Sequence, residues 1–305
     1  MSSRISASPS LSLKNPRRRH KISDPIHITR DTLPDLSKRQ GHKFDHGQAL
    51  ILTGGPGRTG AARLAARGAL RIGAGLVTLG VPPAAQIEVT MQVTALMLTR
   101  VPDADGLSAV LEDNRINAVC LGPGLGLDRA RALVPVALEA VPSVCLDADA
   151  LTAFGDETET LFALLDATCV LTPHGGEFAR LFPDIADRLN GDTTYSKVNA
   201  TRDAAARAGA IVLFKGPDTV IAHPNGRCSV HAAADGREAP WLATAGAGDV
   251  LAGFITGLLA RGFDPMAAAE TATWLHAECA RAFGPGLIAE DVPEMLPTVL
   301  KGLGA

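Results

Sequence analysis

Leu242-Ala243-Thr244-Ala245-Gly246-Ala247-Gly248-Asp249-Val250-Leu251-Ala252-Gly253 is the segment around which the rest of the sequence is organised. Small residues and glycines lead directly into an apolar run, which predicts a helix over 250–260. A helix start leaves backbone N–H groups unpaired and carries the positive end of the dipole. Glycine there lets a phosphate approach the backbone closely. The segment therefore predicts an anion-binding helix start.

Asp249 stands at this helix start, where a carboxylate has two interpretations. It can take a proton from a hydroxyl that attacks a bound phosphate. It can also simply cap the helix, because Asp is a favoured N-cap residue. The other segments of the chain favour the first interpretation, so Asp249 is the candidate catalytic base.

The composition is that of an ordinary globular protein. The 305 residues are 46% hydrophobic and 20% charged, enough for one large domain or two small ones. A net charge of −3 and 4% aromatic residues argue against a nucleic-acid partner. No apolar run has the length of a membrane span. Cys120, Cys145 and Cys169 lie in apolar, strand-like runs and are expected to be reduced core residues of a cytoplasmic protein.

The N-terminal segment differs from the rest. Residues 2–25 are rich in serine and basic residues, with no acidic residue before Asp24. A targeting segment and a disordered tail both have this composition. We expect residues 1–27 to form a flexible basic tail and residues 28–305 to form the folded domain, with Thr29 capping a short helix that ends at Leu36.

Short apolar strands alternate with helices along the folded part. Strands are predicted over 48–53, 75–81, 118–121, 144–146, 169–171 and 211–214, and helices over 61–71, 129–139, 160–165, 195–208, 265–283 and 290–303. Asn225-Gly226 between 220–222 and 228–230 predicts a hairpin. Alternation of this kind predicts a parallel sheet covered by helices on both faces, with ligands beyond the carboxyl ends of the strands.

Polar residues follow these strand ends and helix starts, which should bring His174, Lys215, Thr219 and Asp249 into one cleft. Lys215-Gly216-x-x-Thr219 can place an ammonium and a hydroxyl on phosphates, although a lysine in such a turn is more often solvated. His174 with Glu177 can present an imidazole and a carboxylate to a ligand, or the two can cap a helix together.

Asp147 and Asp149 follow the strand at 144–146 and can contact a metal or cap the next helix. The sequence contains no Ser-His-Asp arrangement and no four-ligand zinc pattern that competes with phosphate chemistry. Together the candidate residues describe phosphate handling next to a carboxylate base.

The Gly-Ala-Gly-Asp run resembles the anion hole and catalytic aspartate of the ribokinase-like superfamily. The fuller pattern is similar to the ADP/ATP-dependent NAD(P)H-hydrate dehydratases, over about residue 40 to the C-terminus. It includes Gly60-Ala61-Ala62, Gly73-Ala74-Gly75-Leu76-Val77, Gly122-Pro123-Gly124, Leu146-Asp147-Ala148-Asp149-Ala150-Leu151, Leu171-Thr172-Pro173-His174-x-Gly176-Glu177, Lys215-Gly216-x-x-Thr219, the Asp249 segment and Leu275-His276. The sequence departs from the family pattern at Gly175, Ala245 and Ala247, none of which removes a catalytic group.

The resemblance implies an α/β fold: a ribokinase-like three-layer sandwich with a mostly parallel central sheet and helices on both faces. It also implies a metabolite-repair lyase that restores the S-form of hydrated NADH or NADPH. ADP or ATP would phosphorylate the ring hydroxyl, phosphate would leave, and AMP or ADP would be released. Mg²⁺, a homotetramer or larger assembly, and a separate epimerase for the R-form are further expectations.

The resemblance also assigns roles to residues. The catalytic group comprises Asp249 as the base, with the anion hole at Gly246, Ala247 and Gly248. The hydrated nicotinamide side comprises Ala61, Gly124, His174 and Asp249. The nucleotide side comprises Lys215, Gly216, Pro217, Asp218, Thr219 and Gly248. Glu177 matches the glutamate placed near magnesium, through water.

Two other functions compete with this interpretation. A ribokinase-like kinase acting on a vitamin precursor or sugar hydroxyl would accumulate a phosphorylated product, whereas the dehydratase releases free phosphate. A catalytically silent nucleotide sensor would tolerate loss of Asp249. An intact Asp249 argues against the sensor.

Overall fold

A single sheet crosses the whole molecule. The computed structural model describes residues 24–233 and 237–305, and within them ten strands pair in the order β1-β10-β9-β8-β7-β6-β5-β2-β3-β4. The β8–β9 and β9–β10 pairs are antiparallel, which confirms the predicted hairpin, and the other described pairs are parallel. The strands are β1 Ile26–His27, β2 Gln48–Leu52, β3 Leu76–Val81, β4 Met97–Arg100, β5 Ile116–Leu121, β6 Val144–Leu146, β7 Cys169–Leu171, β8 Ile211–Phe214, β9 Thr219–Ala222 and β10 Cys228–His231.

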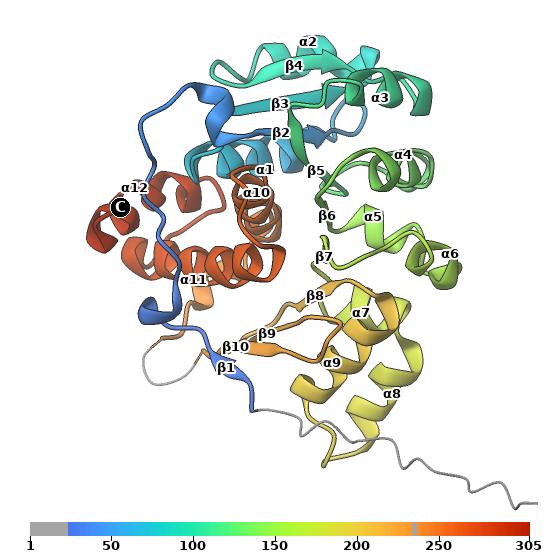
Figure 1. Cartoon of the computed structure of the whole chain (residues 1–305), viewed down its shortest axis with the longest axis vertical. Helices are drawn as coiled ribbons and strands as arrows, with labels where there is room; N and C mark the ends of the chain where they lie inside the picture. The colour runs from blue at the N-terminus through green and yellow to red at the C-terminus, as the bar shows by residue number, and fades with distance from the viewer. Residues whose placement is uncertain (1–23, 234–236) are drawn as a thin grey trace, which may run out of the picture.

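Helices cover both faces of this sheet (Figure 1), and each face has its own apolar core. One face carries α1 Gly60–Arg71, α2 Gln86–Thr90, α10 Ala247–Ala260, α11 Pro265–Phe283 and α12 Asp291–Leu303. The other carries α3 Ala104–Leu111, α4 Leu127–Ala140, α5 Asp149–Thr152, α6 Thr158–Phe162, α7 Gly175–Leu181, α8 Pro183–Gly191 and α9 Lys197–Ala208. Short 3₁₀ helices are η1 Arg30–Thr32, η2 Lys43–His46, η3 Pro83–Ala85 and η4 Pro240–Leu242. The three layers agree with the expected fold class.

The apolar strands are buried because helices cover both sides of them. Every residue of β2 is buried, as expected for a parallel strand in the middle of a sheet. Its side chains alternate between the two cores: Ala49 and Ile51 pack on one face, and Leu50 and Leu52 on the other.

Glycine brings α1 and α10 into close contact. A Cβ on Gly253 of α10 would lie 2.1 Å from the carbonyl oxygen of Ala65 in α1, so no larger residue fits without moving a helix. A Cβ on Gly257 would lie 2.7 Å from the carbonyl oxygen of Ala69. This contact fixes the position of α10 on the sheet, and with it the position of the glycine-rich start of that helix.

The start of the folded part differs from the prediction in two ways. Ile26 and His27 form β1, which pairs with β10, so ordered structure begins inside the segment assigned to the tail. Thr29 is an N-cap as expected, but its helix ends at Thr32 instead of Leu36. Leu33 precedes a proline and is extended, because that position disfavours the helical conformation. Residues 1–23, with most of the basic segment, lie outside the described residues.

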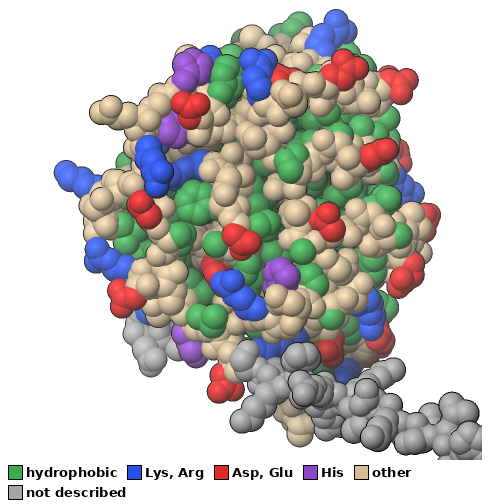
Figure 2. All heavy atoms as spheres, viewed as in Figure 1, with side chains coloured by type: hydrophobic (Ala, Val, Ile, Leu, Met, Phe, Trp, Pro, Cys, Tyr) green, Lys and Arg blue, Asp and Glu red, His purple; other side chains and the backbone are tan. Residues whose placement is uncertain are grey.

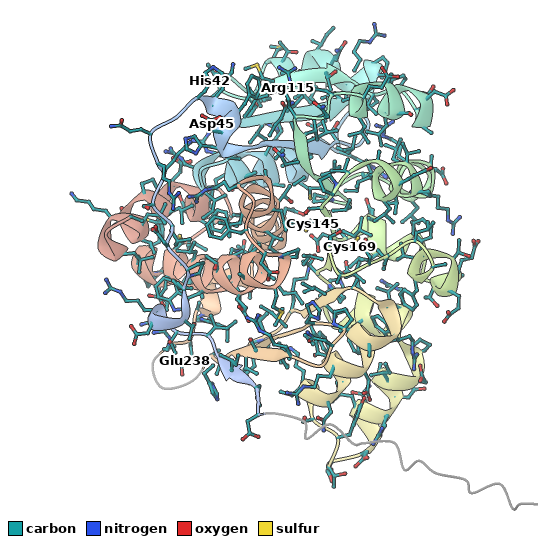
Figure 3. All side chains as sticks on the ribbon, in the orientation of Figure 1. His42, Asp45, Arg115, Cys145, Cys169 and Glu238 are labelled. Atoms are coloured by element: carbon teal, nitrogen blue, oxygen red, sulfur yellow. The ribbon has the colours of Figure 1, made fainter. Side chains whose placement is uncertain are left out.

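All five cysteines are free and buried, which confirms the prediction for Cys120, Cys145 and Cys169. Figure 3 shows Cys145 and Cys169 in the interior, beside the middle strands of the sheet. In the part of the chain that the structure describes, no helix has the length and apolarity needed to cross a membrane. Acidic and basic side chains are interspersed over the face shown in Figure 2.

Candidate active site

Three neighbouring strands, β6, β7 and β8, end at a buried ion pair. Asp147 follows β6, Thr172 follows β7 and Lys215 follows β8. Oδ1 of Asp147 accepts hydrogen bonds from Thr172 Oγ1 and from Lys215 Nζ, each at 2.7 Å. Asp147 is only 2% exposed, and a buried carboxylate of this kind needs such partners. The pair holds the Lys215 ammonium at the carboxyl edge of the sheet.

Asp147 and Asp149 do not cap the next helix, contrary to one of the two expectations. The N-cap of α5 is Ala148, and it makes no side-chain cap hydrogen bond. Asp149 instead accepts a hydrogen bond from the backbone N–H of Gly126 at 2.8 Å, which fixes the glycine loop after β5. Ala148 has φ +45°, a strained conformation for a residue with a Cβ, and strain of this kind is concentrated at functional sites.

His174 and Glu177 form a capping box at the start of α7. Nδ1 of His174 accepts hydrogen bonds from the backbone N–H groups of Gly176 at 2.9 Å and Glu177 at 3.3 Å. Oε2 of Glu177 accepts a hydrogen bond from the backbone N–H of His174 at 2.8 Å. The capping interpretation is therefore the observed geometry. In this geometry Nε2 of His174 lies 3.4 Å from Oε1 of Glu177. The imidazole ring also borders the cavity described below.

The Glu177 carboxylate lies next to the Lys215 ammonium. Its side chain is 5% exposed, and Oε2 lies 3.9 Å from Lys215 Nζ. Burial raises the pKa of Glu177 above its ordinary value, and the positive charge of Lys215 opposes that rise. Lys215 thus faces two buried carboxylates, Asp147 and Glu177, and these hold the pKa of Lys215 above its usual value despite burial.

The start of α10 depends on Gly246. This residue is the N-cap, with φ +91° and no side-chain cap hydrogen bond. A Cβ there would lie 2.7 Å from Leu64 Cδ1 and 2.8 Å from Ala289 Cβ. Helix α10 begins at Ala247, so Asp249 is its third residue and not its N-cap. The capping interpretation of Asp249 is wrong.

The pKa of Asp249 is raised to about 7. Burial is the main cause, and the negative charge of Asp147 is the next; Lys215 opposes both. A carboxylate that titrates near neutral pH can accept a proton efficiently, which is the property that a general base needs. The environment of Asp249 therefore suits proton abstraction better than a purely structural role.

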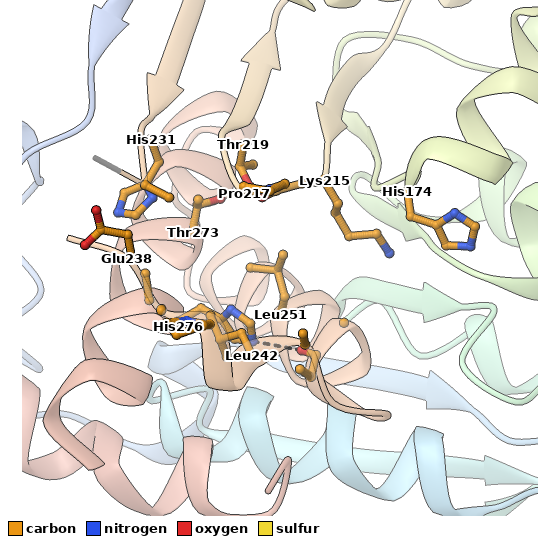
Figure 4. Close-up of a pocket in the computed structure, with 18 of the residues that line it drawn as sticks. His174, Lys215, Pro217, Thr219, His231, Glu238, Leu242, Leu251, Thr273 and His276 are labelled. Carbon is orange, nitrogen blue, oxygen red and sulfur yellow. Dashed lines mark hydrogen bonds between the residues drawn. The ribbon is translucent and has the colours of Figure 1, made fainter. Parts of the chain in front are cut away.

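His276 stabilises the start of α10 from α11. Its Nε2 lies 2.8 Å from the carbonyl oxygen of Ala247, in a contact drawn in Figure 4. Burial lowers the pKa of His276 to about 4, so the ring is neutral and its Nε2–H donates to that carbonyl. His276 belongs to the Leu275-His276 motif, but the sequence gives it no role, because the carbonyl that it contacts is 29 positions away in the chain.

A cavity of about 660 Å³ opens beside these groups (Figure 4). Several predicted site residues line it: His174, Lys215, Gly216, Pro217, Thr219, Ala247 and Gly248. A Cβ on Gly248 would lie 3.5 Å from Lys215 Nζ, so the ammonium stands next to the helix start. Figure 4 shows His174 and Lys215 at one end of the cavity, and His231 and Glu238 at the other. The sequence contained no signal for His231 or Glu238.

The other predicted residues, Asp249 and Glu177 among them, do not line this cavity. The prediction of one cleft therefore holds for His174, Lys215 and Thr219, whereas Asp249 lies within range of the Lys215 charge but outside the lining. The backbone oxygen of Asp218 faces Lys197, and its Oδ1 accepts from the N–H of Ala233 at 2.9 Å. Ala61 and Gly124 are neighbours, because a Cβ on Gly124 would lie 3.4 Å from Ala61 Cβ. The structure therefore brings these two residues of the expected nicotinamide side together, at a place separate from the cavity lining.

The described residues include no cluster of three His, Cys, Asp or Glu side chains arranged to hold a metal ion. Mg²⁺ characteristically keeps several waters and uses one or two carboxylates together with substrate phosphates. The buried carboxylates of Asp147 and Glu177 fit that mode of binding, whereas an all-protein cage does not occur among the described residues.

Comparison with known proteins points to one family. A family model described as NAD(P)H-hydrate dehydratase matches residues 49–300. The bifunctional NAD(P)H-hydrate repair enzyme Nnr of Moorella thermoacetica is 37% identical over 280 residues, which cover 86% of this chain and 51% of that protein. The chain thus spans about half the length of this and similar bifunctional relatives.

Two further comparisons cover nearly the whole of their counterparts. The ADP-dependent (S)-NAD(P)H-hydrate dehydratase of Bacillus subtilis is 32% identical over 286 residues, covering 89% of this chain and 95% of that protein. A crystal structure of the B. subtilis ADP/ATP-dependent NAD(P)H-hydrate dehydratase, co-crystallised with ATP and Mg²⁺, superposes with a TM-score of 0.73 at 28% identity, over 92% of this chain and 99% of that one. The ribokinase-like fold expected from the sequence is confirmed.

Proposed function

The chain belongs to the NAD(P)H-hydrate dehydratase family, and we propose that it dehydrates the S-form of hydrated NADH or NADPH with ADP or ATP as the phosphoryl donor. The observation that carries the proposal is the position of Asp249. Its carboxylate has a pKa near 7, stands in the first turn of a glycine-capped helix, and is influenced by the Lys215 ammonium. A base, an anion-binding helix start and a cation are the groups that phosphoryl transfer to a hydroxyl requires.

The proposed reaction has two stages. Asp249 takes the proton from the ring hydroxyl while that oxygen forms a bond to the terminal phosphorus, and the bond from this phosphorus to the bridging oxygen of ADP or ATP breaks. The phosphate ester then leaves as inorganic phosphate with the ring oxygen, and loss of a ring proton restores the double bond of the reduced nicotinamide. AMP or ADP is the other product, so the net reaction is a carbon–oxygen lyase reaction.

The candidate site residues, inside and outside the cavity lining, divide between the two substrates. The loop from Lys215 to Thr219, together with Gly248, binds the nucleotide phosphates. The N–H groups of Gly246, Ala247 and Gly248 hold the transferred phosphoryl group, for which Ala247 N–H would give up its 3.4 Å hydrogen bond to the Thr244 carbonyl. His174, Ala61 and Gly124 bind the hydrated nicotinamide. Protein catalysis of such a transfer comes mainly from positioning and charge stabilisation, which this arrangement supplies.

Mg²⁺ would neutralise charge on the nucleotide phosphates. Glu177, through water, and Asp147 are the carboxylates that would hold it with those phosphates. We further propose a cytoplasmic homotetramer or larger assembly that acts together with an epimerase for the R-form. The relatives that combine repair activities in one protein support this partnership, because they are named bifunctional repair enzymes.

The test is a spectrophotometric assay with purified protein, hydrated NADH, Mg²⁺, and ADP or ATP in separate reactions. We expect the absorbance of reduced nicotinamide to recover, dependent on a nucleotide, with release of free phosphate. The nucleotide that supports recovery is the phosphoryl donor. A folded, nucleotide-binding protein that gives no recovery contradicts the proposal. A phosphorylated product that accumulates from a vitamin precursor or sugar instead indicates a kinase.

A further inference from the structure

Lys197, the first residue of α9, contacts the loop that connects β8 and β9. Its Nζ donates hydrogen bonds to two carbonyl oxygens of that loop, Lys215 at 3.1 Å and Asp218 at 2.5 Å. One ammonium therefore joins both ends of the loop. Lys215, Gly216, Pro217 and Thr219 of the same loop line the cavity, whereas Lys197 does not.

The two hydrogen bonds determine how the loop's peptide planes face. In a planar trans peptide, the C=O of one residue and the N–H of the next point in opposite directions. Because the Lys215 carbonyl is held by Lys197, the N–H of Gly216 points away from Lys197, and Gly216 is one of the residues that line the cavity. This N–H has no acceptor among the described residues, so it is free to receive one from a ligand.

Gly216 is the residue type that this arrangement requires. A Cβ at position 216 would lie 2.6 Å from Lys197 Nζ, so a side chain would displace the ammonium from the loop. The Lys197 ammonium also lies over the Phe214 ring, with Nζ 4.3 Å from the ring centroid. The loop, the glycine and the lysine thus form one interlocked unit at the end of β8.

We propose that Lys197 is a positioning residue for nucleotide binding, which holds the Lys215 and Asp218 carbonyls so that the Gly216 N–H faces the cavity and receives a nucleotide phosphate. The inference rests on the proposed function, because it takes the ligand of this loop to be ADP or ATP. Lys197 does not touch the nucleotide. It acts through the loop, and its positive charge lies behind the phosphates.

The first test compares Lys197→Met with the wild-type protein by calorimetric titration of ADP and ATP in the presence of Mg²⁺. Methionine is an unbranched apolar side chain of similar length, and it removes both the donors and the charge that lies over Phe214. We expect nucleotide affinity to fall about tenfold, the size of one charge-assisted hydrogen bond. The KM for the nucleotide should rise by the same factor, with kcat and the KM for hydrated NADH changed less than about twofold.

Two variants separate positioning from general effects. Gly216→Ala should lower nucleotide affinity to a similar extent, because its Cβ meets the ammonium while Lys197 remains present. Lys301→Met removes a lysine from the exposed last turn of α12 and should bind nucleotide like the wild-type protein. A purely structural role of Lys197 would instead lower the melting temperature and change both KM values together.

The pH dependence gives an independent readout. Burial lowers the pKa of Lys197 to about 8; Asp218, the charged residue that faces it from the loop, opposes this shift. Nucleotide affinity should therefore fall as the pH rises through about 8. Asp249 titrates near 7 and also repels phosphate when ionised, so the measurement uses the Asp249→Asn background. In Asp249→Asn protein, nucleotide affinity should still fall as the pH rises through about 8. In the double variant that also carries Lys197→Met, this fall should be absent.

Each outcome decides the inference. Folded Lys197→Met protein that binds nucleotide within about twofold of the wild type overturns it, as does a wild-type protein that binds neither ADP nor ATP. Wild-type protein that binds nucleotide but does not restore hydrated NADH contradicts only the proposed reaction. In that case the comparison of Lys197→Met with the wild type still tests the loop.

Discussion

Lys215 and Asp147 form a salt bridge, 2.7 Å long, between the end of β8 and the end of β6. The side chains are 19% and 2% exposed. Residues 68 positions apart thus hold an ammonium at the edge of the sheet before any nucleotide binds. Lys215 also opposes the rise in the pKa of Asp249, so the same ammonium serves the phosphate side and the candidate base.

Lys215→Met should destabilise the fold as well as abolish nucleotide binding. The variant leaves the Asp147 carboxylate buried without its cation, which characteristically costs about 3–5 kcal/mol. Urea unfolding should show this loss relative to the wild type. Adding Asp147→Asn should recover part of the unfolding free energy, because it removes the unpaired carboxylate closest to position 215. The Glu177 carboxylate, 3.9 Å from Lys215 Nζ in the wild type, still lacks its cation, and nucleotide binding should not recover. A Lys215→Met protein within about 1 kcal/mol of the wild type would mean that the ion pair is not a structural element.

Asp249→Asn should separate chemistry from binding. Loss of a positioned general base characteristically reduces turnover by about 10² to 10⁴ fold. Nucleotide affinity should stay the same or improve, because the variant removes a carboxylate that repels phosphate. Single-turnover rates and calorimetric titration measure the two effects. Turnover like that of the wild type would exclude Asp249 as the base.

The pKa of Asp249, raised to about 7, predicts two pH effects. The base acts only when ionised, so kcat/KM for the hydrated cofactor should fall as the pH drops below about 7, and Asp249→Asn should lack this dependence. In the folded state the carboxyl binds a proton more tightly than in the unfolded chain, so its contribution to stability decreases as the pH rises from about 4 to 7. Asp249→Asn should therefore unfold with a higher free energy than the wild type at pH 8, with little difference at pH 4. An identical difference at both pH values would contradict the raised pKa.

Apolar runs predicted the central elements closely. The strands at 144–146 and 169–171 and the helix at 265–283 have the predicted bounds, because each is buried on the faces that its pattern marks as apolar. Elements at the edge were harder to predict. β4 has no predicted counterpart, since its four residues are exposed or half-buried and Met97 is 47% exposed. β1 has two exposed residues, and its pairing with β10 depends on a contact across 203 positions, from Ile26 to Ser229.

The candidate site follows the same division. Residues that come directly after strands, such as His174 and Lys215, could be placed at one edge of the sheet from their position in the sequence. Their partners could not. Asp147 meets Lys215 because β6, β7 and β8 lie next to one another in the sheet. Lys197 contacts the loop between β8 and β9 from helix α9. These contacts depend on how layers pack, which no local pattern contains.

Gly253→Ala should destabilise the protein through the contact between α1 and α10. The added Cβ would lie 2.1 Å from the carbonyl oxygen of Ala65, and overpacking of this kind costs about 1–3 kcal/mol. Gly302→Ala is the matched control, because position 302 lies in α12 and a Cβ added there would have no atom of the described residues within 4 Å. The control should stabilise by about 0.5–1 kcal/mol, from the higher helix propensity of alanine. Thermal unfolding of the two variants should show shifts of opposite sign, and equal shifts would contradict the close helix contact.

His174→Asn should distinguish the cap of α7 from binding of the hydrated nicotinamide. Asparagine is a favoured N-cap residue, so it can accept the backbone N–H bonds that Nδ1 accepts in the wild type. Stability should therefore change by less than about 0.5 kcal/mol, whereas His174→Ala should lose about 1 kcal/mol with the cap. If the imidazole also contacts the substrate, both variants should raise the KM for hydrated NADH about fivefold, the size of one hydrogen bond. Steady-state kinetics with saturating nucleotide, together with urea unfolding, measure both quantities. A normal KM in His174→Asn would assign His174 to the cap alone and would remove it from the nicotinamide side.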